Sequence, residues 1–184
     1  MEPINLQLDS VISLRTATFL SNGKKSQTIS ATFEKMKFFE PLKIKNYGTG
    51  ISYLYYEGEY NSAKKIGDSE VYNGIVRNIR LPEDRTDKFF AVTYSGYLKI
   101  PADDVYTFYL TCDDGAVLYI QDYLVIDNDN FQWATTKSGK IALKEGLHPF
   151  KLKYFQAKYG HYLDLQVESG TMEKQRIPDK WLWH

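Results

Sequence analysis

The sequence predicts an all-β protein, an antiparallel β-sandwich preceded by a few strands of a small, truncated sandwich. Many short stretches alternate apolar and polar side chains with a period of two, which is the periodicity of a half-buried strand. Clusters of turn residues separate these stretches at regular spacing. Aromatic residues make up 15% of the chain, and they are common in strands because they pack well on a pleated surface.

Composition excludes several classes of function. The 184 residues carry 23 basic and 23 acidic side chains, so the chain lacks the positive charge that attracts nucleic acids or anionic membranes. No apolar run is long enough for a transmembrane helix. The single cysteine, Cys112, rules out an internal disulfide framework. We therefore expect neither a nucleic-acid partner nor a membrane span.

The first part of the chain contains two predicted strands joined by a tight turn. They are residues 11 to 20 and 27 to 33, and Asn22-Gly23 between them is the strongest short signal for a β-hairpin. A strand-like alternation at residues 5 to 8 follows Met1 almost directly. Strands this short cannot bury a core alone. We therefore expect an excised part of a longer protein, with Met1 added or exposed by cloning.

A domain boundary is predicted in the turn-rich stretch NYGTG, which gives domains of residues 1–46 and 47–184. An aromatic strand follows at residues 51 to 60. Residues 61 to 88 are polar and irregular, and we expect a loop whose charged end is solvated.

The β signal is dense in the second half. Strands are predicted at residues 90 to 94, 97 to 100, 105 to 112, 141 to 143, 150 to 154 and 162 to 167. In the third of these, alternate side chains from Tyr106 to Cys112 share one apolar face. Cys112 is therefore predicted to be a small buried hydrophobe and not a reactive thiol.

Asp113-Asp114-Gly115 forms the apex after that strand, and two interpretations stay open. One is a tight turn with Asx hydrogen bonds and a positive φ at Gly115. The other is a calcium site, since calcium accepts 6–8 oxygen ligands and the loop with Asp127, Asn128, Asp129 and Asn130 follows. Neighbouring side chains of a strand point to opposite faces, so both aspartates reach one ion only if the chain turns sharply between them. A cis peptide would achieve this at a cost of roughly 3–4 kcal/mol.

The ordered motifs along residues 47 to 184 resemble the PA14 domain. The resemblance is carried by YYEG at 55, FFAVTYSGYL at 89, YTF at 106, DDGAVLYI at 113, LVIDN at 124, LKEGLH at 143, YF at 154 and LDL at 163. It implies a β-sandwich module that is usually non-catalytic and often binds carbohydrate.

In the calcium-dependent sugar-binding members of that family, two neighbouring aspartates at this apex and an asparagine in a following loop hold the ion. The resemblance places these roles on Asp113, Asp114 and Asn128, both for sugar and for calcium. One departure is Gln156, where many members carry an acidic residue after the Tyr-Phe pair.

The N-terminal part resembles the last strands of the small sandwich after the barrel of bacterial family-20 β-N-acetylhexosaminidases. The matching stretches are RTATF at 15, NGKKS at 22 and ATFEK at 31. In some such enzymes a PA14 module follows at the C-terminus. This resemblance implies a parent glycosidase whose catalytic domain is absent, acting in the periplasm or outside the cell.

Aromatic residues outside the strands allow two roles. Trp133 could stack on a sugar ring beside the apex, or cover the edge of the sandwich. Trp181 and Trp183 are predicted to close the sandwich or pack on the preceding small domain. His148 follows a glycine turn, and we expect a structural role for it.

The leading hypothesis is a non-catalytic module that binds a glycan for a secreted glycoside hydrolase, with or without calcium. The alternative is a structural module that packs on the catalytic domain or mediates dimerisation. An enzyme is a third hypothesis, which would make the apex aspartates an acid/base pair. The chain has no Asp-Glu dipeptide, which family-20 enzymes use together with substrate assistance.

Overall fold

The structure is a computed structural model and describes residues 10 to 67 and 70 to 184. The chain divides after Lys37 into two compact units, and the fold is all-β as predicted. The alternation at residues 5 to 8 lies outside the described residues. In the described part of the chain, no helix is long and apolar enough to cross a membrane.

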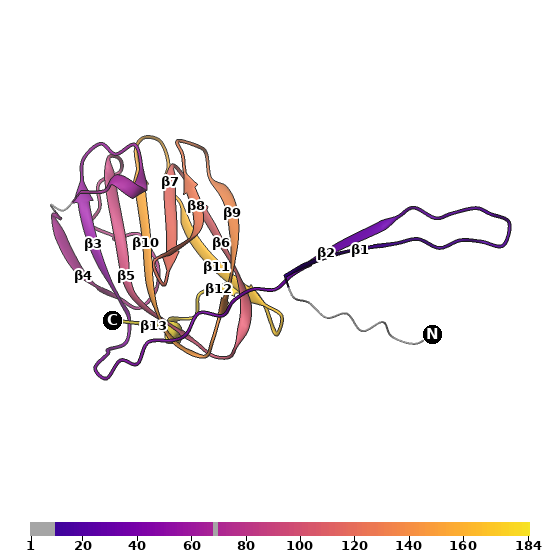
Figure 1. The fold of residues 1–184 in the computed structure, drawn as a ribbon. Helices are drawn as coiled ribbons and strands as arrows, with labels where there is room; N and C mark the ends of the chain where they lie inside the picture. The colour runs from indigo at the N-terminus through magenta and orange to yellow at the C-terminus, as the bar shows by residue number, and fades with distance from the viewer. Residues whose placement is uncertain (1–9, 68–69) are drawn as a thin grey trace. The chain divides into compact units, whose positions relative to one another are not determined.

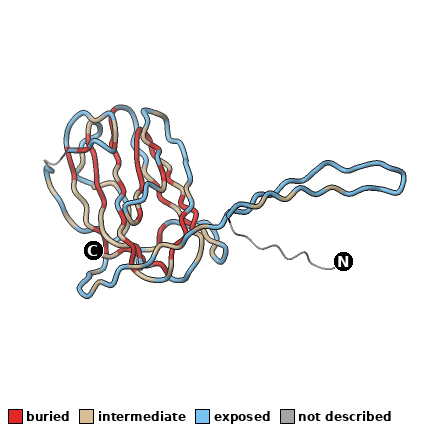
Figure 2. The backbone as a smooth tube through the Cα atoms, viewed as in Figure 1, coloured by how far each residue is buried: buried red, intermediate tan, exposed pale blue. Residues whose placement is uncertain are grey.

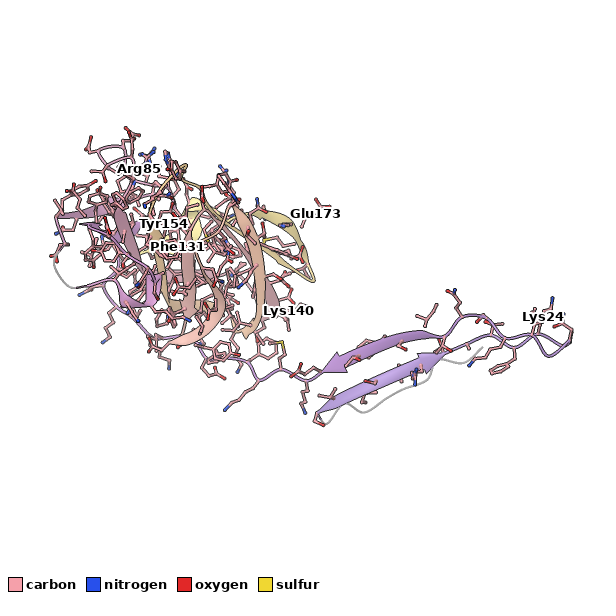
Figure 3. All side chains as sticks on the ribbon, turned by 90° about the horizontal axis from the view of Figure 1, so that it is seen from above. Lys24, Arg85, Phe131, Lys140, Tyr154 and Glu173 are labelled. Atoms are coloured by element: carbon pink, nitrogen blue, oxygen red, sulfur yellow. The ribbon has the colours of Figure 1, made fainter. Side chains whose placement is uncertain are left out.

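The first unit is the predicted hairpin. Strands β1 (Val11–Thr16) and β2 (Ile29–Glu34) pair antiparallel, and Gly23 takes the left-handed φ of 79° that the tight turn needs. Figure 3 shows Lys24 at the tip of this hairpin. The register places most apolar side chains on one face and most polar ones on the other, with Val11 opposite Glu34 on the polar face. The apolar face consists of Ile12, Leu14, Ile29, Ala31 and Phe33. None of its described residues is buried (Figure 2).

The second unit is a sandwich of two antiparallel sheets (Figure 1). The larger sheet has the order β4-β3-β5-β10-β7-β8, with β13 also paired to β5. Its strands are β4 (Tyr72–Val76), β3 (Ile51–Glu57), β5 (Phe90–Ile100), β10 (Gly146–Gln156), β7 (Gly115–Ile120), β8 (Tyr123–Asp129) and β13 (Leu182–Trp183). The smaller sheet has the order β12-β11-β6-β9. Its strands are β12 (Met172–Arg176), β11 (Leu163–Ser169), β6 (Asp104–Cys112) and β9 (Thr135–Leu143). Two 3-10 turns complete the unit, η1 (Ala63–Lys65) and η2 (Asp179–Trp181).

The core lies between the two sheets, where Figure 2 shows the buried residues concentrated. The predicted face of β6 is confirmed, since Tyr106, Phe108, Leu110 and Cys112 are all buried. Burial, with a smaller contribution from nearby carboxylates, raises the pKa of the Cys112 thiol to about 12. The prediction of an unreactive, hydrophobe-like cysteine therefore agrees with its environment.

The sequence patterns did not predict the short elements η1, β4, β12 and β13. The loop expected over residues 61 to 88 contains η1 and the edge strand β4, whose sequence YNGIV carries Asn-Gly and little apolar alternation. Strands β12 and β13 were missed because β12 is almost entirely polar and β13 has two residues. Tertiary pairing, which the sequence pattern does not report, supplies their stability.

The segment between the hairpin and β3 joins the sandwich. The backbone N–H of Phe39 donates to Ala142 O at 2.9 Å, and that of Leu42 donates to Leu147 O at 2.8 Å. Phe39 also packs against the core. The compact unit thus begins at Phe38, ahead of the boundary that the sequence predicts after residue 46.

The terminal tryptophans close the sandwich. Trp181 is buried with its ring edge-on to Tyr106, and Trp183 pairs with β5. His148 is fully buried, and its ring nitrogens contact Lys144 O and the Gln121 side-chain amide. Burial lowers its pKa, so a structural role for the neutral ring is confirmed.

Candidate functional site

The apex at Asp113 and Asp114 connects the two sheets. Strand β6 ends at Cys112 in the smaller sheet, and β7 begins at Gly115 in the larger one. Asp114 makes the sharp turn with a φ of 55°, which is the left-handed region that Asp tolerates better than most residues. The described residues contain no cis peptide, and Gly115 is not the residue with positive φ. The chain therefore turns sharply at the apex without the cis bond that the calcium interpretation offered, and the positive φ falls on Asp114 and not on Gly115 as the tight-turn interpretation had it.

Two loops hold the apex in place through its backbone. The N–H of Asp113 donates to Tyr162 O at 3.0 Å, and the N–H of Asp114 donates to Gln132 O at 2.9 Å. The second N–H also lies 3.0 Å from Asp113 Oδ1. This contact reaches the next residue, whereas an Asx turn bonds the backbone two residues on. The apex is thus a fixed part of the sandwich.

The carboxylate of Asp114 is buried and accepts two hydrogen bonds at Oδ2. Ala157 N donates at 2.7 Å and Gln156 Nε2 at 3.0 Å. Burial is the main cause that raises the pKa of Asp114, and the charge of Asp113 acts in the same direction. Gln156 is itself fully buried, with Tyr154 Oη donating to its Oε1. An amide at this position therefore donates to the apex carboxylate, which an ionised acid could not do.

Asn128 lies in β8 with no exposed surface, and its side chain links strands and loops. Its Nδ2 donates to Thr135 O at 2.8 Å and to Leu110 O at 3.3 Å, while its Oδ1 accepts from Gln132 Nε2 at 2.7 Å. Two of these partners are backbone carbonyls, and the third, Gln132, belongs to the lining of the pocket described below. Asn128 does not belong to the described lining of the pocket beside the apex.

A pocket of about 620 Å³ opens beside the apex. Asp113 and Asp114 belong to its lining, and aromatic rings surround them. Trp133 and Tyr159 are each 80% exposed and Phe131 is 61% exposed. Phe131 packs edge-on against the buried Phe155 at 5.4 Å, and Figure 3 shows Phe131 on the sandwich unit. The remaining described lining consists of Glu59, Tyr60, Asn61, Phe89, Gln132, Ala157 and Lys158.

The structure thus brings together three of the four predicted site residues, Asp113, Asp114 and Trp133. The sequence interpretation missed Tyr159, Phe131 and Tyr60, which come from three different loops. One signal pointed to Tyr159, which precedes Gly160 after a strand, because glycine often marks a turn and turns lie at the surface.

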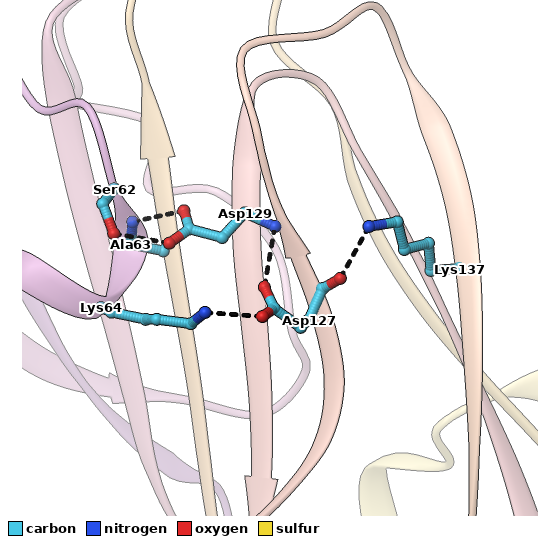
Figure 4. A network of polar contacts seen from close by, with 6 residues as sticks. All are labelled: Ser62, Ala63, Lys64, Asp127, Asp129 and Lys137. Carbon is cyan, nitrogen blue, oxygen red and sulfur yellow. Dashed lines mark hydrogen bonds and ion pairs between the residues drawn. The ribbon is translucent and has the colours of Figure 1, made fainter.

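The described residues meet only part of the requirement for calcium. Two adjacent carboxylates, those of Asp113 and Asp114, fit the ion's preference for oxygen ligands. The oxygen of Asn128 already accepts from Gln132. Asp127 and Asp129, the other predicted candidates, accept hydrogen bonds from η1 and its neighbour Ser62 (Figure 4). Among the described residues, no group of three acidic, histidine or cysteine side chains could hold a metal.

The fold and the apex together identify the class of this protein. The family model described as the PA14 domain matches residues 48–180. The chain therefore belongs to the PA14 domain family.

This chain spans only part of the length of the anti-sigma factor relatives that it matches. Anti-sigma-I factor RsgI3 of Acetivibrio thermocellus is 30% identical over 95 residues, which is 51% of this chain and 15% of that protein. An anti-sigma factor domain-containing protein from Clostridium clariflavum is 22% identical at a TM-score of 0.64, covering 88% of this chain and 57% of that one. A PA14 sugar-binding domain from an RTX adhesin is 18% identical at a TM-score of 0.62, covering 74% of this chain and 98% of that one.

Proposed function

We propose that this chain is a non-catalytic carbohydrate-binding module and that the pocket at the apex binds the glycan. The observation that carries the proposal is the combination of a buried polar floor, Asp113 and Asp114, with the exposed rings of Trp133 and Tyr159. A sugar presents hydroxyl groups at its edge and an apolar face, so it uses both kinds of surface. The adhesin domain of the same fold is described as sugar-binding, which supports this assignment.

The charges of the pocket favour a neutral or amino-bearing sugar. Three carboxylates, of Glu59, Asp113 and Asp114, belong to the lining, against the single ammonium group of Lys158. An anionic sugar such as a uronate would place like charges close together in a partly desolvated site. Bound calcium would reverse this preference, because the ion becomes the largest local charge.

Titration calorimetry against neutral, amino and uronic oligosaccharides, with calcium and with chelator, tests the proposal. We expect weak binding of neutral or amino sugars in both conditions. Binding that disappears with chelator would support the calcium-dependent form, in which Asp113 and Asp114 supply ligands. Failure of every sugar to bind in both conditions would contradict the proposal.

Two kinds of parent protein follow from the observations. The N-terminal strands suggested a secreted family-20 β-N-acetylhexosaminidase, whereas the relatives are anti-sigma factor domain-containing proteins. A non-catalytic glycan-binding module is compatible with either parent. We favour the anti-sigma parent, because it rests on a measured similarity.

A second candidate function is a structural one, and the hairpin favours it. Its apolar face, led by Ile29 at 71% and Phe33 at 50% exposure, is what a two-stranded sheet would bury against another domain. Light scattering of this chain, beside the same chain with Ile29→Ser and Phe33→Ser, would detect dimerisation through this face. A dissociable dimer that the two substitutions abolish would support the structural function.

A further inference from the structure

We infer that Asp129 is a positioning residue that sets the distance between the two aromatic walls of the apex pocket. This inference rests on the proposed function of that pocket. One wall consists of Glu59, Tyr60 and Asn61, and the other of Phe131, Gln132 and Trp133. Asp129 is the residue through which the two walls are joined.

The carboxylate of Asp129 fixes the first wall directly after its last residue. Its Oδ1 accepts from Ala63 N at 2.6 Å, and its Oδ2 accepts from Ser62 Oγ at 2.5 Å (Figure 4). These short, charge-assisted bonds are the stronger kind of hydrogen bond. Ala63 is fully buried, so its N–H has no access to water as an alternative partner.

The backbone of Asp129 fixes the second wall. Asp129 is the last residue of β8, where it pairs with Gly115 of β7, and Phe131 follows two positions later. Gly115 in turn follows the apex aspartates, so Asp129 lies at the junction of the floor and both walls. A Cβ on Gly115 would lie 2.7 Å from Asp129 Oδ1 and 2.2 Å from Phe155 Cε1. Only glycine lets this carboxylate approach the apex so closely.

A neighbouring pair provides an internal comparison. Lys64 and Asp127 link the same loop to the same strand at 2.6 Å, but both side chains are more than 40% exposed. An exposed ion pair contributes little, because water solvates both charges and salt screens them. Asp127 is therefore a matched control for Asp129. It lies on the same strand, contacts the same segment and carries the same charge.

The test measures glycan affinity and amide hydrogen exchange of four variants beside the unchanged chain. Asp129→Ala removes both bonds, and we expect about a tenfold loss of affinity together with faster exchange at residues 59 to 63. Ser62→Ala removes one bond and should give an intermediate loss. Asp129→Asn keeps an acceptor for Ala63 N–H and should restore affinity to within about threefold. Asp127→Asn should change neither quantity.

The outcomes separate this inference from the proposed function. If the unchanged chain binds no sugar, the proposed function fails, while faster exchange at residues 59 to 63 in Asp129→Ala still supports Asp129 as the residue that holds the wall. If Asp129→Ala folds and both its affinity and its exchange match the unchanged chain, the inference is overturned. If Asp129→Ala fails to fold, Asp129→Asn and Ser62→Ala are compared with Asp127→Asn instead. Equal glycan affinity and equal exchange at residues 59 to 63 in all three variants would overturn the inference.

Discussion

Gln156 Nε2 lies 3.0 Å from Asp114 Oδ2 in the interior of the sandwich, and both side chains are buried. The amide therefore partly satisfies a carboxylate that has little access to water. It does so without adding a positive charge, so the apex keeps its negative character. Gln156 is the position at which this chain departs from the pattern that its resemblance implied, and its amide supplies a donor that an ionised acid would lack.

Gln156→Glu should destabilise the fold at neutral pH. The substitution replaces a donor by a second carboxylate about 3 Å from the first, and two buried like charges cannot both stay ionised at low cost. We expect a loss of about 1–3 kcal/mol in the free energy of unfolding at pH 7, with a smaller loss at pH 5. Urea denaturation at both pH values measures this.

Gln166→Glu is the matched control for that substitution. Gln166 Nε2 donates to Asp164 Oδ2 at 2.8 Å, but Arg176 lies 2.8 Å from the other oxygen of Asp164. Because this cation stabilises neighbouring carboxylates, Gln166→Glu should lower the free energy of unfolding by much less than Gln156→Glu does. Equal losses in the two variants would show that burial of the apex is not the cause.

The stability of the fold should depend on Asp114 at mildly acidic pH. Burial, together with the charge of Asp113, raises the pKa of Asp114 above its ordinary value of 3.8. The ordinary pKa applies to the unfolded chain and the raised pKa to the folded one. At a pH between the two, the folded state binds more protons than the unfolded state, so the contribution of Asp114 to stability increases as pH falls. The unfolding free energy of the unchanged chain minus that of Asp114→Asn should therefore increase as pH falls through the raised pKa of Asp114, and it should level off below 3.8. A pH-independent difference would contradict the raised pKa.

Trp133→Ala should weaken glycan binding without changing the fold. The ring is 80% exposed, so its removal costs little packing, whereas a stacked aromatic contact contributes about 0.5–1.5 kcal/mol. Titration calorimetry should show roughly a 3- to 10-fold loss of affinity at an unchanged melting temperature. Phe19→Ala on the hairpin, 70% exposed, is the control and should leave affinity unchanged. Equal effects of the two substitutions would remove Trp133 from the site.

Cys112 should not react with a thiol reagent while the protein is folded. Its side chain has no exposed surface, and its pKa is raised to about 12, so almost no thiolate is present or accessible at pH 8. Reaction with Ellman's reagent should be negligible in buffer and complete in urea. Rapid reaction of the folded chain would show that the β6 end opens readily.

The sequence predicted the sandwich well because its core strands follow simple rules. The period-two alternation in β6 and the Asn22-Gly23 turn both report local physics, and both are confirmed. The path of the chain at the apex was harder to predict. Alternation showed that Asp113 and Asp114 need a sharp turn, but the crossing from one sheet to the other depends on strand pairing far along the chain.

Most residues in the walls of the site could not be predicted from the sequence. Tyr60, Phe131 and Tyr159 lie on loops without periodicity, and their meeting depends on where those loops end in the folded sheets. Asp129 was predicted only as one of several loop oxygens near a cation. Its contacts with Ser62 and Ala63 join positions 66 to 67 residues apart, which no local pattern reports.

The order of strands in the larger sheet governs when this protein can fold during synthesis. Strand β5 ends at residue 100, and its partner β10 begins at residue 146 and also pairs with β7. Until the ribosome has released β10, both β5 and β7 present an unpaired edge, and synthesis at about 5–20 residues per second leaves these edges open for seconds. Closure of long-range pairs is also intrinsically slow. The nascent sandwich therefore passes through a period of seconds in which these edges have no strand partner.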